Sequence, residues 1–212
     1  MLFKPGVIEL NDRSTEIIDE LQKDMKESFD HSCRIFQTEI EKHGDQIWNE
    51  LQSAIRKVLE FTDQMQKQRK KSDIHYLAFS FLRSSLFQDN PELRIETLDD
   101  SFYLDVQEAA AYYCPLFLRE RYQEDLSGLY QAVQKKFVRL QAFEMFLVKA
   151  QYISYYESFL YRMIESLAEL IMEEVIRSGV HITGGFRIIY GEFMDKATAV
   201  YAKEKEDEVL SD

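Results

Sequence analysis

Glycine, proline and cysteine are scarce in this chain, whose 212 residues include 7 Gly, 3 Pro and 2 Cys. Sandwiches, barrels and Rossmann-type sheets need many turns, which glycine and proline usually form, so such folds are not expected. Cys33 and Cys114 belong to no CxxC pair and have no histidine at zinc-ligand spacing. A disulfide framework and a zinc site are therefore not expected either, and two reduced thiols fit the cytoplasm.

Positive charge is also in short supply, with 26 Lys and Arg against 38 Asp and Glu and a formal net charge of −12. Nucleic-acid phosphates require a basic surface, so no nucleic-acid partner is expected. The one basic run contains Lys67, Arg69, Lys70 and Lys71. We interpret it as the solvated end of a helix, where cations complement the helix dipole.

Long apolar runs are missing too. A membrane-spanning helix needs about 18 or more apolar residues, whereas the longest candidate, Ala150–Tyr156, is closed by Lys149 and Glu157. The first ten residues, MLFKPGVIEL, have no apolar stretch before their Pro-Gly pair and do not resemble a secretory signal. Motifs of common enzymes and nucleotide sites (HExxH, GxSxG, Walker A, GxGxxG) do not occur. We expect a cytoplasmic protein with no membrane partner and no cofactor.

Aromatic residues are abundant: 15 Phe and 12 Tyr contribute to a hydrophobic content of 45%. This is enough apolar surface for one core in a single domain over residues 1–212. From residue 12 to 71, apolar side chains recur in steps of three and four between Ile18 and Met65, which predicts a long amphipathic helix. His43–Gly44–Asp45 leaves two alternatives, a helical hairpin broken there or a continuous rod about 75 Å long.

Residues 72–113 are expected to hold short helices and one β-hairpin. The run Ile74–Phe87 is almost continuously apolar, and its length favours a buried helix over a strand. Leu93–Thr97 alternates between apolar and polar residues and, with Phe102–Leu104, predicts an antiparallel hairpin. Val106–Tyr113 predicts a further helix, which ends before Pro115 because the residue preceding a proline avoids the helical conformation.

A core helix is predicted over residues 114–178. Its part Phe137–Ile176 is apolar on nearly every face, so we expect it at the centre of a bundle or against a second subunit. Residues 179–202 fit either a helical stripe or, as favoured here, a second hairpin that turns at Asp195–Lys196. Residues 203–212 are interpreted as an acidic tail. The expected fold class is mainly α: a bundle of long helices around a central apolar helix, with a small antiparallel β-sheet of one or two hairpins.

Charged residues on the packed side of the core helix are the most informative feature for function. Lys149 and Glu157 lie two turns apart among tyrosines, and a charge on a packed face must be paired or hydrogen-bonded. The favoured interpretation is an ion pair that fixes helix register, also against a second subunit. The alternative is a polar ligand pocket formed by Lys149, Tyr155, Tyr156, Glu157 and Tyr161.

The long apolar stripe and the core helix together favour a non-enzymatic scaffold or protein-interaction protein that self-associates, with coiled-coil character. The alternative function is a small-ligand-binding helical protein, or an enzyme, with its pocket near Glu157. Metal binding through His31, His43 and neighbouring carboxylates ranks below both, because no third ligand falls at helical spacing. We therefore expect no catalytic residue, metal or cofactor, and a protein partner or a second copy of the chain.

Overall fold

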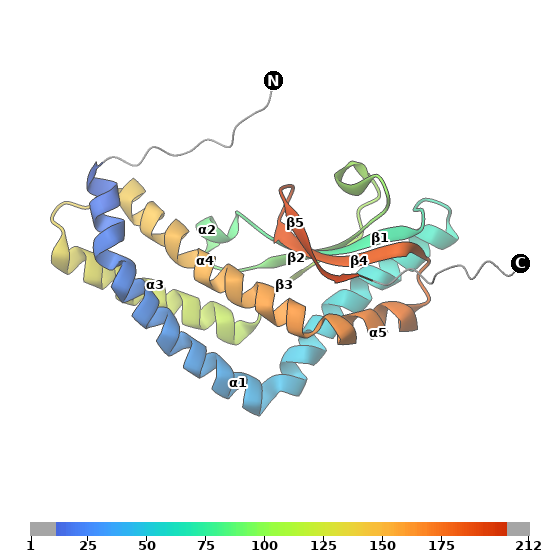
Figure 1. Ribbon diagram of the computed structural model, residues 1–212, viewed down its shortest axis with the longest axis horizontal. Helices are drawn as coiled ribbons and strands as arrows, with labels where there is room; N and C mark the ends of the chain where they lie inside the picture. Colours follow the sequence, from blue (N-terminus) through green and yellow to red (C-terminus); the bar gives the residue numbers. More distant parts are fainter. Residues whose placement is uncertain (1–11, 203–212) are drawn as a thin grey trace, which may run out of the picture.

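A computed structural model describes residues 12–202, so the predictions for the first ten residues and for the acidic tail at 203–212 lie outside the described residues. The long helices lie on one side of a five-stranded sheet (Figure 1). Between residues 12 and 202, no helix combines the length and hydrophobicity that a membrane crossing requires.

The first helix, α1, spans Asp12–Lys67 and is a single bent helix, so neither the straight rod nor the hairpin describes it fully (Figure 1). The bend lies at His43, whose φ of −128° and ψ of 17° are not helical. The stripe of α1 is buried, with its interior formed by Ile17, Leu21, Met25, Phe36, Leu51, Ile55, Val58 and Leu59. These side chains pack against α3 (Leu116–Lys136), α4 (Ala142–Ser166), α5 (Ala168–Ser178) and the sheet of the same chain.

The sheet has the strand order β3-β2-β1-β4-β5. Its strands are β1 (Ile74–Phe81), β2 (Leu93–Leu98), β3 (Ala110–Tyr113), β4 (Ile182–Glu192) and β5 (Ala197–Ala202). The central pair, β1 and β4, is parallel, with Leu77 opposite Ile188, and the other three pairings are antiparallel. Parallel strands need a long crossover connection, and here it contains α3, α4 and α5.

The prediction of a mainly α bundle with one or two hairpins was therefore wrong. Although 63% of the described structure is helical, the fold is α/β, with a mixed five-stranded sheet. Ile74–Phe81 is a strand instead of a helix because β1 is central and buried on both faces, so its apolar residues do not alternate. Ala110–Tyr113 is a strand as well, and Phe102–Leu104 is a short 3-10 helix, η1. The coiled-coil prediction is not supported, since α1 packs against several elements of its own chain.

The predicted core helix at 114–178 is three helices, separated at residues 137–141 and at Leu167. At the first break, Gln141 and Glu144 form a capping box that starts α4. A short helix, α2 (Ser85–Gln88), follows β1. The chain between the antiparallel strands β4 and β5 turns over residues 193–196, which include the Asp195–Lys196 turn expected for residues 179–202.

The two faces of the sheet differ. One packs on the helices, whereas the other carries a small cluster of Ala78, Leu98 and Ile189, partly covered by Tyr76, Phe102 and Tyr103. The segment 99–109 crosses this second face and is held by an ion pair between Lys71 and Asp105, whose side chains are both almost fully buried. Lys71 is thus a structural cation, contrary to its interpretation as part of a solvated helix end.

Candidate functional site

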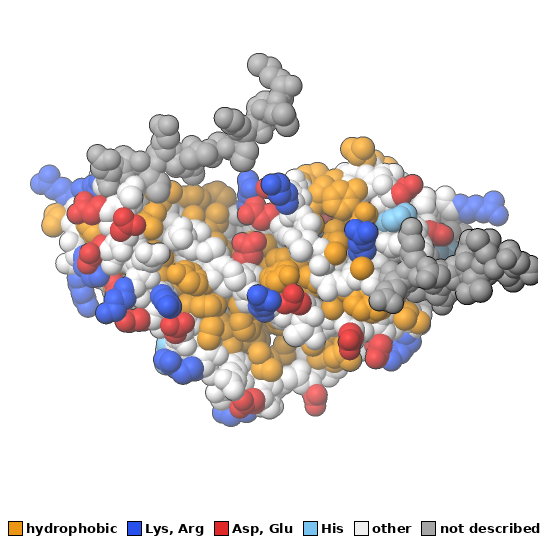
Figure 2. All heavy atoms as spheres, in the orientation of Figure 1, with side chains coloured by type: hydrophobic (Ala, Val, Ile, Leu, Met, Phe, Trp, Pro, Cys, Tyr) orange, Lys and Arg blue, Asp and Glu red, His pale blue; other side chains and the backbone are white. Residues whose placement is uncertain are grey.

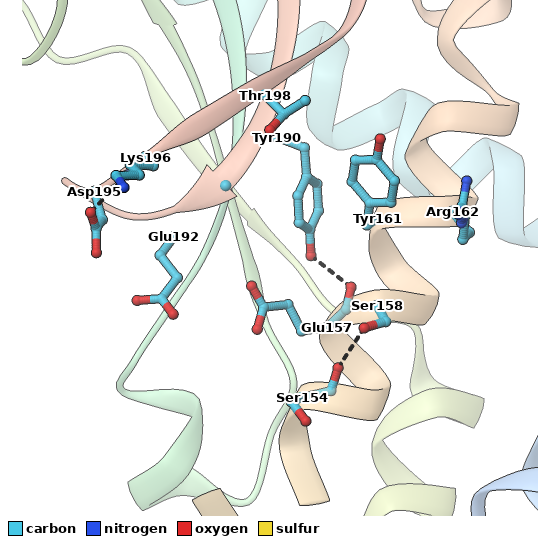
Figure 3. A pocket seen from close by; sticks show the side chains of 11 residues that line it. Ser154, Glu157, Ser158, Tyr161, Arg162, Tyr190, Glu192, Asp195, Lys196 and Thr198 are labelled. Carbon is cyan, nitrogen blue, oxygen red and sulfur yellow. Dashed lines mark hydrogen bonds between the residues drawn. The ribbon is translucent and has the colours of Figure 1, made fainter. Parts of the chain in front are cut away.

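A cleft of about 560 Å³ lies between α4 and the β4–β5 hairpin. Figure 3 shows α4 on one side of it and the hairpin on the other. Its lining is mostly polar and consists of Ser154, Glu157, Ser158, Tyr161, Arg162, Tyr190, Gly191, Glu192, Asp195, Lys196 and Thr198. Eight of these eleven residues carry a side-chain hydroxyl or carboxylate.

Helical spacing places the α4 residues on one face. Ser154, Glu157, Ser158 and Tyr161 follow one another in steps of three, one and three along a regular helix, so they project to the same side. The two serine hydroxyls donate to carbonyls of α4 itself: Ser154 to that of Gln151 at 2.7 Å, and Ser158 to that of Ser154 at 2.8 Å. Neither serine is therefore activated by a base.

The opposite wall depends on a close approach within the hairpin. Gly191 pairs with Ala197, and a Cβ at position 191 would lie 2.2 Å from the carbonyl oxygen of Lys196, so only glycine fits there. The close pairing places Glu192 and the turn residues at the carboxyl end of β4, beside the carboxyl end of the parallel strand β1. Ligands of α/β sheets commonly bind outside the carboxyl ends of such strands, where the chain leaves in opposite directions.

Glu157 is the unusual residue of the cleft. It is half-buried, and within residues 12–202 no hydrogen bond or ion pair reaches its carboxylate. Burial raises the pKa of the Glu157 carboxyl above its ordinary value, and the negative charge of Glu192 raises it further. In Figure 3 the two carboxylates lie on facing sides of the cleft. A cation between them would relieve both the desolvation and the repulsion.

Most of the other charges around the cleft have partners; the exposed Lys196 side chain, in the hairpin turn, has none among the described residues. Arg83 binds Glu192 with an N–O distance of 2.7 Å and also reaches Asp195 at 3.4 Å. Arg162 pairs with Glu165 at 2.7 Å. Of the three carboxylates that line the cleft, Glu157 is therefore the one without an ion pair among the described residues.

Two tyrosine rings form the apolar part of the wall. Tyr161 and Tyr190 meet edge to face with ring centroids 5.4 Å apart. The Tyr190 hydroxyl donates to the backbone carbonyl of Glu157 at 3.1 Å (Figure 3). Burial, with a smaller contribution from the charge of Glu157, raises the pKa of Tyr190, so this phenol stays protonated and holds the hairpin against α4.

The five residues predicted for the pocket are divided between three places. Glu157 and Tyr161 line the cleft. Lys149 makes a close ion pair with Asp89, after α2, instead of pairing with Glu157. Tyr155 packs on the ring of Phe29, with centroids 5.2 Å apart, and Tyr156 points into the core between α1, α3 and α4.

Tyr156 belongs to a buried polar cluster around Asp125 of α3, which was not predicted from the sequence. The Asp125 carboxylate accepts hydrogen bonds from the hydroxyls of Tyr152 (2.5 Å), Tyr156 (2.7 Å) and Ser32 (2.6 Å), and it pairs with Arg121 at 2.6 Å. Asp125, Tyr152 and Tyr156 are all buried in the core and satisfy one another, so we interpret this cluster as structural. Its signal in the sequence is an aspartate that falls between Tyr122 and Leu129 on the apolar face of α3.

The hairpin half of the cleft was missed as well. Tyr190, Glu192 and Gly191 lie in residues 179–202, where helix and strand could not be separated by pattern. A glycine inside a strand pattern often marks a close backbone approach, and Gly191 carried that signal. Within the described part of the chain, no group of three or more His, Cys, Asp or Glu side chains could hold a metal ion.

Comparison of the sequence with protein-family models and with curated proteins, and of the chain with solved structures, found no match.

Proposed function

We propose that this protein binds a small polar molecule carrying a protonated amine in the cleft between α4 and the β4–β5 hairpin. The observation that carries the proposal is the Glu157 carboxylate, half-buried at the wall of a 560 Å³ cleft with no partner among the described residues. A buried charge is costly unless it is paired, so this carboxylate calls for a cation from outside the chain.

The rest of the cleft suits such a ligand. Its volume falls in the range of about 300–1,000 Å³ that small-molecule sites occupy. Tyr161 and Tyr190 offer ring edges and faces for an apolar or aromatic part of the ligand, and ammonium groups also bind well beside aromatic rings. Because Arg83 pairs with both Glu192 and Asp195, Glu157 is the one carboxylate of the lining without an ion pair, which matches a ligand with one positive charge.

Binding is proposed here in preference to catalysis. No histidine lines the described cleft, and both of its serines donate to backbone carbonyls. A nucleophile paired with a base, which covalent catalysis requires, is therefore not assembled among these residues.

Self-association stays a prediction. The stripe on α1 that motivated it is buried against other elements of the same chain, so it offers no long apolar face to a second copy. A cytoplasmic location also stays a prediction; Cys33 and Cys114 are free thiols and partly buried, which suits a reducing compartment.

The proposal is tested with two probes that differ only in the charged group, tyramine and its alcohol analogue tyrosol. Titration of ¹⁵N-labelled protein is expected to show saturable shifts of the amides of Gly191, Glu192 and Thr198 with tyramine, and binding about tenfold or more weaker with tyrosol, because one buried ion pair is lost. In the variant Glu157→Gln, tyramine should bind no better than tyrosol.

The matched control is Glu173→Gln, which removes the same charge from an exposed position on α5. This variant should bind tyramine as the wild type does. Equal affinity for tyramine and tyrosol, or unchanged tyramine binding in Glu157→Gln, would contradict the proposal.

A further inference from the structure

A second concavity, of about 370 Å³, lies beneath α4 at the bend of α1. Its walls are almost wholly apolar, with Ile40 and Trp48 contributed by α1 and Phe159 and Met163 by α4. Figure 2 shows hydrophobic side chains gathered on the surface between the C-terminal half of α4 and the bend of α1. We call this concavity the bend groove.

The bend groove exists because two helices are interrupted at the same level. α1 leaves helical geometry at His43, and α4 ends at Ser166, with Leu167 joining it to α5. Gly44 lies at the wall of the groove, where a Cβ would meet nothing within 4 Å. Because Gly44 has no side chain, the floor of the groove is open. The backbone conformation of Gly44 would nevertheless accept a side chain.

The polar part of the groove lies on one edge. Arg162 and Ser166 are four residues apart on α4 and therefore adjacent on its surface, and both are exposed. Met163, one residue beyond Arg162, is buried and faces the apolar side. The Arg162 guanidinium uses one nitrogen for Glu165 at 2.7 Å, and a guanidinium has five N–H donors in all.

We infer that the bend groove binds a single-chain amphiphile with an anionic head group, of the class of a medium-chain fatty acid. The alkyl chain would lie among Trp48, Phe159 and Met163, and the carboxylate would bind Arg162 at the edge. An apolar pocket with one or a few polar groups that fix orientation is the usual form of a small-molecule site. The volume is near the lower end of the range for such sites, which suits one chain and excludes a two-chain lipid. The bend groove shares Arg162 with the lining of the proposed amine site and no other residue, and the inference does not depend on amine binding.

Trp48 provides a direct probe, because it is the one tryptophan of the whole chain and it lines the groove. Bromine quenches tryptophan fluorescence at short range, so 11-bromoundecanoic acid is expected to quench the protein saturably with one molecule bound per chain. Undecanoic acid should relieve the quenching by competition. Undecylamine, with the same chain and a positive head group, should compete about tenfold less well.

Two substitutions at one position test the location. Gly44→Leu places a side chain one helical turn from Trp48 and fills the groove, so it is expected to weaken binding about tenfold or more. Gly44→Ala adds only a Cβ into open space and should bind as the wild type does. Circular dichroism and thermal melting of both variants check that the fold is retained.

Each of these measurements can contradict one part of the inference. Quenching that is unchanged in Gly44→Leu would overturn the assignment to this groove, as would quenching that does not saturate. Equal competition by undecylamine and undecanoic acid would overturn the anionic head group. If Gly44→Leu fails to fold, saturable one-to-one quenching of Trp48, which lines the groove, still tests the location, and the two competitors still test the head group.

Discussion

Substitution of Asp125 by alanine is expected to lower the free energy of unfolding by about 3–5 kcal/mol, the range for removing one partner of a buried charge network. Four groups converge on this carboxylate, and its side chain is fully buried. Without it, the Arg121 guanidinium, which is 19% exposed, loses its buried counter-charge. The hydroxyls of Tyr152 and Tyr156 lose their acceptor, and unpaired buried donors are costly.

Urea denaturation monitored by circular dichroism measures this loss. Glu124→Ala is the matched control, because Glu124 is the neighbouring residue and also pairs with Arg121 but is 69% exposed. Exposed ion pairs contribute about 0–1 kcal/mol, so this variant should unfold nearly as the wild type does. A loss below about 1 kcal/mol for Asp125→Ala would show that the cluster does not hold α1, α3 and α4 together.

Substitution of Lys71 by methionine should cost a similar amount, again about 3–5 kcal/mol, since it leaves the buried Asp105 without its counter-charge. The Lys71 and Asp105 side chains are 0% and 2% exposed. Lys71 also donates to the carbonyl of Gln107 at 2.8 Å, while Asp105 accepts from the backbone N–H groups of Asp99 and Gln107. The loss should therefore include local release of the segment 99–109 from the second face of the sheet.

Hydrogen exchange of the amides in 99–109, combined with urea denaturation, checks both parts of this expectation. Lys70→Met is the control, because Lys70 precedes Lys71 and is exposed; its unfolding free energy should change by less than about 0.5 kcal/mol. If Lys71→Met and Lys70→Met were equally stable, Lys71 would be the solvated cation that its sequence context indicated.

The periodicity of apolar residues predicted those helices and strands whose pattern lies within one segment of the chain. The steps of three and four between Ile18 and Met65 predicted the helix α1 and most of its packed face, although Ile40 and Phe61 of that stripe are exposed. The alternation of Leu93–Thr97 corresponds to β2. The bend at His43 left no phase jump in the stripe. For that reason the sequence could not separate a bent helix from a hairpin.

The central strand β1 could not be predicted in the same way. A strand covered on both faces has a continuous apolar run, which a buried helix shares. What makes Ile74–Phe81 a strand is its pairing with β2 and, in parallel, with β4 more than 100 residues later, as in Leu77 opposite Ile188. Such pairing is non-local and leaves no periodic signal in either segment.

The candidate site, too, could be predicted where it depends on helix periodicity and not where it depends on contacts between distant segments. Glu157 was found because its position on a helix face follows from the sequence alone. Its environment depends on the hairpin that crosses α4, and Tyr190 and Glu192 came from a segment of ambiguous pattern. The partner of Lys149 was also not accessible to helix geometry, because Asp89 follows α2 and approaches from another part of the chain.

The most direct test of the account is the pKa of Glu157 measured by ¹³C NMR on protein labelled in the glutamate side chains, with and without saturating tyramine. The Glu157 resonance is assigned by its loss in Glu157→Gln. In the free protein the pKa should lie above the ordinary value of 4.5, because burial and the charge of Glu192 both disfavour the carboxylate. A bound cation favours the ionised form, so tyramine should lower this pKa, and by linkage tyramine should bind more weakly as the pH falls through it. An elevated pKa that is unmoved by saturating tyramine would contradict the account.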